Sequence, residues 1–260
     1  MLTHPTIEQL HAMGLKGMAK ALVDLSDNDD ARALSHAEWL GLLLEREATL
    51  RHDRRLAARL RFAKLRFQAA PEDVDWQIPR ALDRPLFTAL MKCKWIDAAE
   101  PVLITGKTGL GKSWLACALG FAACRSNHTV LYYRAEKLFA DLALARVDGR
   151  YPRLIRLLCS VKLLIIDDFG LAPLDAQGRK DLLELVEERY GRTGLVVTSQ
   201  LAVDKWHVMV GDPTYADAIL DRIAHNSHRV TLEGDSIRKT KGRQSKAANT
   251  GAAAAGARDS

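Results

Sequence analysis

Apolar residues follow two different spacings along the chain. Up to about residue 70 they recur every three or four positions, as at Leu10, Met13, Met18, Leu22 and Leu25. This is the spacing of amphipathic helices. A polar break over 26–39 interrupts it, and Ser35 is the type of residue that caps the start of a following helix. The pattern predicts a helical N-terminal domain over residues 1–70.

From about residue 101 the pattern changes to short apolar runs separated by helical stretches. Five runs have the length and composition of buried strands, at 101–106, 129–133, 162–168, 195–200 and 228–234. Strands that alternate with helices in this way form a mostly parallel sheet with helices on both faces. We therefore expect an α/β domain over 101–240.

The segments on either side of this domain have a different character. Prolines at 71, 79 and 85 forbid a continuous helix over 71–100, which we interpret as a connector. The basic and alanine-rich tail at 241–260 offers almost nothing large to bury, so we expect no packed structure there.

Composition excludes several classes of protein. A chain of 260 residues with 48% hydrophobic content can bury one α/β core and carry a small accessory region. Its apolar runs are too short to span a bilayer, and its start lacks the pattern of a signal peptide, so we expect a cytoplasmic protein with no membrane partner. The four cysteines form no CxxC pair, which argues against a zinc site or a disulfide framework.

The formal net charge of +6 is moderate, but the positive charge is concentrated. Seven Arg or Lys residues lie within 50–67, against a single Asp. At helical spacing Arg51, Arg55, Arg59 and Arg66 share one face, and Leu56, Leu60, Ala63 and Phe67 share another. Such a helix would dock through its apolar face and present a basic ridge, although a run of charge can also be an ordinary solvated surface.

Residues 104–120, ITGKTGLGKSWLACALG, place a glycine-rich loop between a strand and an apolar helix. Gly106 to Lys112 match the pattern GxxxxGK, and Ser113 completes it. In such a loop, backbone N–H groups converge on the β-phosphate, the lysine neutralises β- and γ-phosphate charge, and the hydroxyl binds Mg²⁺. We therefore expect ATP and Mg²⁺ as cofactors, with nucleotide contacts from Gly106, Lys107, Thr108, Gly109, Leu110, Gly111, Lys112, Ser113 and Trp114.

Two adjacent acids, Asp167 and Asp168, end the third apolar run. The Mg²⁺ of a phosphate-binding loop needs a carboxylate at the end of a neighbouring strand. We expect Asp167 to hold Mg²⁺ through water, and Asp168 to face the γ-phosphate and polarise the attacking water. Two acids after a strand could, taken alone, also form a simple turn.

Further polar groups follow the fourth run, which ends in Thr198, Ser199 and Gln200. A strand placed between the other two would bring Ser199 or Gln200 near the γ-phosphate to orient water, and the sequence leaves open which of the three side chains points inward. Arg222, on a later apolar helix, could reach the γ-phosphate of a neighbouring subunit as an arginine finger, or could form an ordinary salt bridge.

Several stretches together resemble the IstB family, the ATP-binding helper proteins of bacterial insertion sequences. They are LITGKTGLGKSWLACALG, LLIIDDFGLAPLD, VVTSQLAVDKWH, GDPTYADAILDRI and SIRK, with GLKGMAKAL and WQIPRALDR in the N-terminal part. These helpers are related to the helicase loader DnaC and, more distantly, to the initiator DnaA within the AAA+ class. The resemblance implies an AAA+ P-loop fold with strand order 5-1-4-3-2, ATP-dependent self-assembly on duplex DNA, and cooperation with a separate transposase.

The resemblance also implies roles for individual residues. Lys112 and Ser113 would bind phosphate and Mg²⁺, and Asp167 and Asp168 would form the Walker B pair. Ser199 and Gln200 fall at the sensor I position, Arg222 at the arginine finger, and Arg238 of SIRK where a sensor II arginine would be sought, although this chain offers no helical lid after the last strand.

A long arginine-rich segment between the second and third runs points to nucleic acid. Arg146, Arg150, Arg153 and Arg156 are spaced to line a helical surface around a DG turn. We expect these arginines, with Arg51, Arg55 and Arg59, to contact DNA phosphates without reading bases, since phosphate contacts fix position rather than sequence. The alternative is that they pair with neighbouring acids.

Two functions remain open at this point. One is an ATPase that assembles on duplex target DNA, largely independently of sequence, and recruits or activates a transposase. The other is a DnaC-like loader that grips a replicative helicase. A small-molecule kinase is disfavoured by Asp168 and the arginine-rich crossover.

Overall fold

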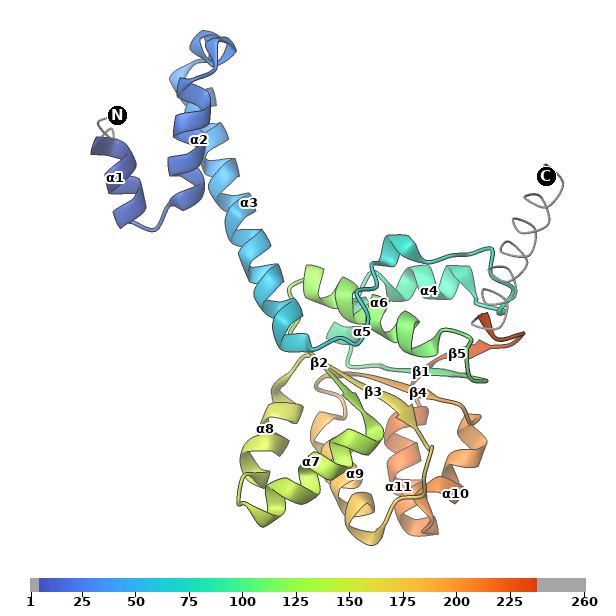
Figure 1. Ribbon diagram of the computed structural model, residues 1–260. Coiled ribbons are helices and arrows are strands. Elements are labelled where there is room, and N and C mark those ends of the chain that lie inside the picture. Colours follow the sequence, from blue (N-terminus) through green and yellow to red (C-terminus); the bar gives the residue numbers. More distant parts are fainter. Residues whose placement is uncertain (1–4, 238–260) are drawn as a thin grey trace, which may run out of the picture. The chain divides into compact units, whose positions relative to one another are not determined.

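In the computed structural model, which describes residues 5–237 apart from the side chains at 30 and 32, the chain divides into two units between Arg61 and Phe62 (Figure 1). The first unit contains α1 (Pro5–Ala12), α2 (Lys16–Ser26), η1 (Asp29–Ala33) and most of α3 (His36–Ala63). It is therefore helical, as the apolar spacing predicts. The expected tail at 241–260 lies outside the described residues, and the boundaries at 70, 100 and 240 stay predictions.

Hydrogen bonds at its N-terminus explain where the long helix α3 begins. The Ser35 hydroxyl accepts from the N–H of Glu38 at 3.4 Å, while the Glu38 carboxylate accepts from the N–H of Ser35 at 2.8 Å. This reciprocal pair is a capping box, which satisfies two backbone donors that a helix start leaves free. Ser35 thus caps α3 as the sequence predicts.

Glu47 joins α2 to α3 within the first unit. Its carboxylate accepts from the backbone N–H groups of Gly17 at 2.6 Å and Met18 at 3.2 Å, in the first turn of α2. It also accepts from Arg51 at 2.7 Å, and this bond is the largest cause of the lowered pKa of Glu47. One charged side chain of α3 therefore satisfies the orphan donors of a neighbouring helix and complements its dipole.

The prediction that four arginines share one face of this helix is wrong for Arg66, which lies beyond the end of α3. The helix ends at Ala63, and Lys64 has a left-handed φ of 53° that no continuing helix allows. Arg66 and Phe67 therefore leave the helix axis, and both line a cavity of the second unit.

The second unit is built on a sheet of five parallel strands in the order β2-β3-β4-β1-β5. This confirms the expected order 5-1-4-3-2, counted from the other edge. The strands are β1 (Pro101–Gly106), β2 (Val130–Arg134), β3 (Leu163–Phe169), β4 (Gly194–Ser199) and β5 (His228–Leu232). The middle strands read as continuous apolar runs because helices cover both faces of the sheet.

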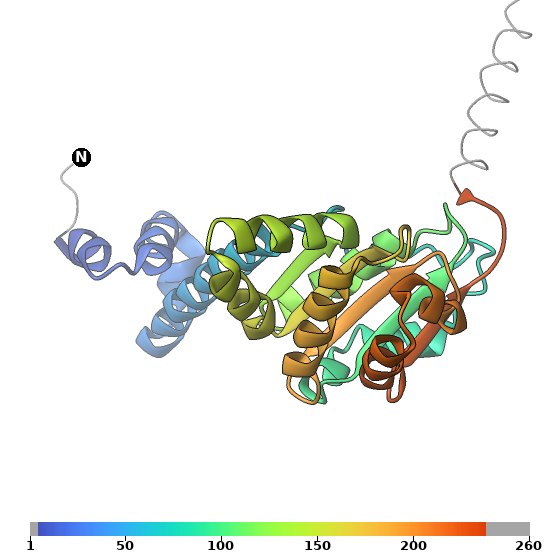
Figure 2. The same cartoon turned by 90° about the horizontal axis from the view of Figure 1, so that it is seen from below.

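Two groups of helices form the outer layers (Figure 1). One face carries α4 (Arg84–Leu90), α5 (Lys94–Asp97) and α6 (Lys112–Arg125), reached from Ala63 through η2 (Pro71–Asp73). The other carries the main apolar core, beneath the helices seen side by side from below in Figure 2. These are α7 (Ala135–Val147), α8 (Tyr151–Ser160), α9 (Ala176–Arg189), α10 (Trp206–Val210) and α11 (Pro213–Ala224), with η3 (Val203–Lys205) before α10.

A buried arginine ties this second layer to the sheet. The Arg189 guanidinium donates to the backbone carbonyls of Leu158, Val161 and Gly194, at the end of α8, ahead of β3 and at the start of β4. Burial lowers the pKa of Arg189 to about 10. Three carbonyl dipoles, rather than a single acid, thus stabilise the positive charge of Arg189 inside the core.

Among residues 5–237 no helix has both the length and the apolar character needed to cross a membrane.

Replacing Glu47 by Ala should release the first turn of α2. We expect faster amide hydrogen exchange at Gly17 and Met18 and a lower melting temperature at pH 7, with Glu45→Ala, an exposed change on the same helix, as control. Because the pKa of folded Glu47 is depressed, its stabilisation is present above the ordinary glutamate pKa and is lost as pH falls through the folded value. The difference between the two proteins should therefore shrink below about pH 4. Equal exchange at both amides in the two proteins would contradict this role.

Candidate active site

The glycine-rich loop joins β1 directly to the first turn of α6. Gly111, in a left-handed conformation with φ of 86°, ends the loop, and α6 begins at Lys112. A side chain at Gly106 would place its Cβ 2.4 Å from the carbonyl oxygen of Leu232, so only glycine fits beneath the neighbouring strand. The N-terminal N–H groups of α6 therefore face the loop, as an anion site requires.

Lys112 lies folded back over this loop. Its ammonium donates to the carbonyls of Gly106 at 2.6 Å and Lys107 at 3.0 Å, and the residue is only 5% exposed. A buried lysine bound to neutral carbonyls can exchange them for the charged oxygens of a phosphate, which bind an ammonium more strongly.

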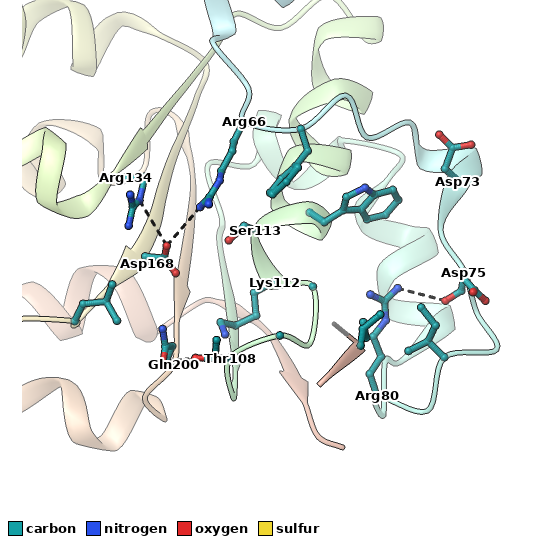
Figure 3. A pocket seen from close by; sticks show the side chains of 17 residues that line it. Arg66, Asp73, Asp75, Arg80, Thr108, Lys112, Ser113, Arg134, Asp168 and Gln200 are labelled. Carbon is teal, nitrogen blue, oxygen red and sulfur yellow. Dashed lines mark hydrogen bonds and ion pairs between the residues drawn. The ribbon is translucent and has the colours of Figure 1, made fainter. Parts of the chain in front are cut away.

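A cavity of about 600 Å³ opens beside the loop (Figure 3). Of the nine predicted nucleotide contacts, six line it: Thr108, Gly109, Gly111, Lys112, Ser113 and Trp114. Gly106 and Lys107 act through the carbonyls that hold Lys112, and Leu110 is fully buried behind the loop. Asp168, Arg134 and Gln200 line one end, and the connector residues Asp75 and Arg80 line the other.

Asp167 is completely buried at the end of β3. One carboxylate oxygen accepts from the Tyr132 hydroxyl at 2.5 Å, and the other accepts from the Thr198 hydroxyl at 2.6 Å. Burial and the bond to Asp167 raise the pKa of Tyr132 far above its usual range, so its hydroxyl remains a donor. Strands β2 and β4 thus hold the carboxylate of β3 from both sides.

Asp168 points toward the cavity because the backbone turns there. Its φ of 59° is left-handed, and the register between β3 and β4 shifts between Ile166 and Phe169. The Asp168 N–H donates to the Thr198 hydroxyl at 3.0 Å, the same hydroxyl that donates to Asp167. A single threonine therefore sets the conformation that sends two neighbouring acids in different directions.

Two arginines lie against the Asp168 carboxylate at the cavity (Figure 3). Arg66 Nη1 is 3.8 Å and Arg134 Nε is 3.7 Å from the same oxygen, Oδ2. Sequence reasoning missed both roles. Arg134 ends β2 and could have been found, because the carboxyl ends of parallel strands meet at one edge of the sheet. Arg66 could not, because the break at Lys64 carries no sequence signal.

The end of β4 answers the question that the sequence leaves open. Thr198 and Ser199 are both fully buried, with Thr198 bonded to the acids and the Ser199 hydroxyl donating to the carbonyl of Phe169 at 2.7 Å. Gln200 lines the cavity, and its side-chain oxygen accepts from the Thr108 hydroxyl at 2.6 Å. Gln200 is thus the residue of the three that faces the glycine-rich loop.

Arg222 lies on α11 and is absent from the residues that line the cavity. Its guanidinium pairs with Glu187 of α9 at 2.8 Å and donates to the carbonyl of Ala218 at 2.7 Å, and its side chain is 29% exposed. Within one chain it forms the salt bridge that the sequence allowed. Its action on a neighbouring subunit stays a prediction, and Arg238 lies outside the described residues.

The arginines predicted to bind DNA differ in their surroundings. Three are held by acids: Arg51 by Glu47, Arg146 by Asp181 and Arg150 by Asp148. Arg55, Arg153 and Arg156 are exposed, and Arg59 is half-buried. Arg153 and Arg156 lie on α8 and line a second cavity of about 870 Å³ beside β2. Ion pairing therefore leaves Arg153 and Arg156 as the more available cations of this segment.

Comparison with known proteins agrees with this geometry. Residues 8–245 match the family model described as IstB-like ATP binding protein. The chain is 60% identical over 245 residues to a putative insertion sequence ATP-binding protein of Sinorhizobium fredii, covering 94% of this chain and 100% of that one. It is 43% identical to the putative ATP-binding protein of insertion sequence IS1162 from Pseudomonas fluorescens, covering 77% and 87%.

Solved structures share the fold. The chain superimposes on DnaI with a TM-score of 0.56 at 17% identity, covering 64% of this chain and 92% of that one. It superimposes on AMPPCP-bound DnaA from Aquifex aeolicus with a TM-score of 0.55 at 18% identity, covering 70% and 56%. These likenesses establish the AAA+ fold of the second unit.

Mutation should separate the predicted roles of Asp168 and Lys112. Asp168→Asn keeps the shape and removes the charge, so we expect ATP to bind as in the parent protein while hydrolysis falls by at least about a hundredfold. Lys112→Ala removes the cation predicted to bind phosphate and should weaken nucleotide binding itself. Equilibrium binding and phosphate release measure the two effects. Parent-rate hydrolysis by Asp168→Asn would show that the two acids are wrongly assigned.

Proposed function

The chain belongs to the family of IstB-like ATP-binding proteins, and from this premise we propose that it is an ATP-hydrolysing AAA+ helper of an insertion sequence. It would assemble on duplex DNA with ATP bound and recruit or activate a transposase there. One observation supports ATP hydrolysis: Asp168 lines the same cavity as the phosphate-binding loop, at the end opposite the connector. We place the protein in the cytoplasm and assign it no membrane partner.

The residues of the cavity can bind and orient the phosphate chain of ATP. The N–H groups at the start of α6 would bind the α- and β-phosphates, and the Lys112 ammonium would reach the β- and γ-phosphates. Gln200 and Asp168 line the cavity at the γ-phosphate end. There the amide can orient a water molecule, and the carboxylate can accept its proton as the oxygen attacks the γ-phosphorus and the bond to the departing ADP breaks.

The donor set also suits Mg²⁺. Ser113 lines the cavity, and hydrogen bonds orient both carboxylate oxygens of Asp167 at the end of β3. Mg²⁺ prefers oxygen ligands and keeps several waters, which matches a hydroxyl and a carboxylate acting through water. When bound, Mg²⁺ would neutralise charge on the phosphates. The hydrogen bonds from Tyr132 and Thr198 would hold Asp167 in place for it.

The position of Arg222 supports self-assembly. It lies on α11 with a partly exposed guanidinium, outside the residues that line the cavity of its own chain. A guanidinium supplied by a neighbouring subunit would complete the charge stabilisation at the γ-phosphate, as arginine fingers do. Hydrolysis would then depend on assembly, and release of phosphate would loosen it.

Charge supports duplex DNA as the surface on which the protein assembles. Arg153 and Arg156 are exposed on α8, and Arg55 is exposed on α3. Flexible arginine side chains on a helix surface suit phosphate contacts, which are largely independent of sequence. The alternative, a loader of a replicative helicase, is favoured only by a shared fold with DnaC and DnaI. Relatives at 60% and 43% identity are named for insertion sequences, which supports the first function and the transposase as partner.

Assembly on DNA should depend on ATP. We expect a non-hydrolysable ATP analogue to drive the purified protein into large complexes on naked duplex DNA, and ADP to leave it dispersed. Sedimentation or electron microscopy would detect the difference. Arg222→Ala should bind nucleotide yet hydrolyse slowly in these complexes. A loader should instead ignore duplex DNA unless its helicase is present, so indifference to DNA would favour that function.

The two exposed arginines of α8 should contribute to the salt dependence of DNA binding. Arg153→Glu and Arg156→Glu should each weaken binding and reduce the slope of log affinity against log salt by about one. Arg229→Glu is the matched control, since Arg229 is exposed on β5 at the opposite edge of the sheet. An unchanged slope in both α8 variants would remove this helix from the DNA surface.

A further inference from the structure

Arg80 is a buried cation at the connector end of the nucleotide cavity. It is only 3% exposed, and it lines the same cavity as Gly111, Lys112 and Ser113. Figure 3 shows it across the cavity from Asp168, with Lys112 between them. Burial lowers the pKa of Arg80, and the charge of Asp75 acts in the opposite direction.

The hydrogen bonds of Arg80 are few for a buried guanidinium. Nη1 lies 3.5 Å from the carbonyl of Leu110, Nη2 lies 3.3 Å from the carbonyl of Asp75, and Nε has no hydrogen-bond partner within the described structure. Arg189, also buried among the described residues, has an unpaired Nε as well, but its two Nη atoms donate to three core carbonyls. Buried donors are normally satisfied, and long bonds to neutral carbonyls compensate a desolvated cation poorly. Arg80 therefore lacks the strong anionic partner that its position calls for.

The backbone holds Arg80 firmly against the phosphate-binding loop. The carbonyl of Arg80 accepts from the N–H of Glu233, in the segment that leaves β5. The same segment reaches the loop, where the N–H of Ile237 donates to the carbonyl of Gly109 at 3.0 Å. A Cβ at Gly111 would lie 2.9 Å from Arg80 Nη1, so the guanidinium touches the residue before the first turn of α6. Connector, loop and the end of β5 thus fix one cation beside the N–H groups of that turn.

We propose that Arg80 binds the α- and β-phosphates of the nucleotide, the part that ATP and ADP share. The start of α6 faces these two phosphates in a loop of this type, and Arg80 lies beside it, whereas Asp168 and Gln200 line the opposite end. A guanidinium offers paired donors that match phosphate oxygens. The phosphates would supply the anion that buried Arg80 lacks, so the connector contributes directly to nucleotide affinity. This inference rests on the proposed function of the same cavity.

The test compares Arg80→Met with Arg84→Met in the full-length protein. Arg84 is exposed, stacks on Trp76 and is absent from the lining of the cavity, so it controls for the same chemical change four residues away. Calorimetric titration with ADP and with AMPPCP should show that Arg80→Met loses about tenfold or more in affinity for both, by the same factor. Arg80→Lys should recover part of the loss, and Arg84→Met should bind as the parent does.

Melting temperatures separate ligand binding from a structural role. Since Arg80→Met removes a poorly compensated buried charge, the ligand-free variant should melt at the parent temperature or above it, with a smaller shift on adding ADP. A lower ligand-free melting temperature with an unchanged ADP-induced shift would overturn the proposal. So would a loss of AMPPCP affinity alone, which would place Arg80 at the γ-phosphate.

Lys112→Ala distinguishes failure of this inference from failure of the proposed function. If Lys112→Ala binds ADP as the parent does, the cavity is not the nucleotide site and both proposals fall. If Lys112→Ala loses affinity and Arg80→Met does not, the nucleotide site stands and the role of Arg80 is refuted.

Discussion

The geometry of the candidate active site depends on one fully buried carboxylate, Asp167. An ionised group without contact with water is costly unless its oxygens are hydrogen-bonded, and here strands on both sides provide the donors, Tyr132 from β2 and Thr198 from β4. The same Thr198 hydroxyl accepts from the N–H of Asp168, whose left-handed backbone turns the second acid toward the cavity. Three adjacent strands are therefore held in the register that keeps Asp167 buried and turns Asp168 toward the cavity.

The other wall of the cavity comes from outside the sheet. The connector and the segment that follows β5 bond to each other, through Arg80 and Glu233, and to the glycine-rich loop, through Gly109 and Ile237. These two short segments line the end of the cavity remote from Asp168. Their packing explains why Gly109 and Gly234 leave no room for a side chain.

Charged side chains line the cavity along its whole length. Arg66 and Arg134 approach Asp168, Arg80 lies at the opposite end of the cavity, and Lys112 lies between them. Away from the cavity, acids neutralise some of the arginines that the sequence groups together, such as Arg146, and leave others, such as Arg153, exposed. The basic composition alone could not distinguish the paired arginines from the exposed ones, because it does not show which acids the fold places next to which arginines.

The sequence by itself determined the fold class, the strand order through its family resemblance, the phosphate-binding loop and the two acids. These features depend on local spacing: apolar periodicity, glycines at fixed intervals, and polar residues directly after a strand. Only the tertiary structure decided that Gln200 rather than Thr198 or Ser199 faces the loop, that Arg66 leaves the helix of Arg51 and Arg55, and that Arg80 reaches the nucleotide cavity. Those outcomes depend on contacts between segments far apart in the chain. Such contacts depend on how the folded chain packs around a buried charge or a backbone turn. A local sequence pattern does not contain this information.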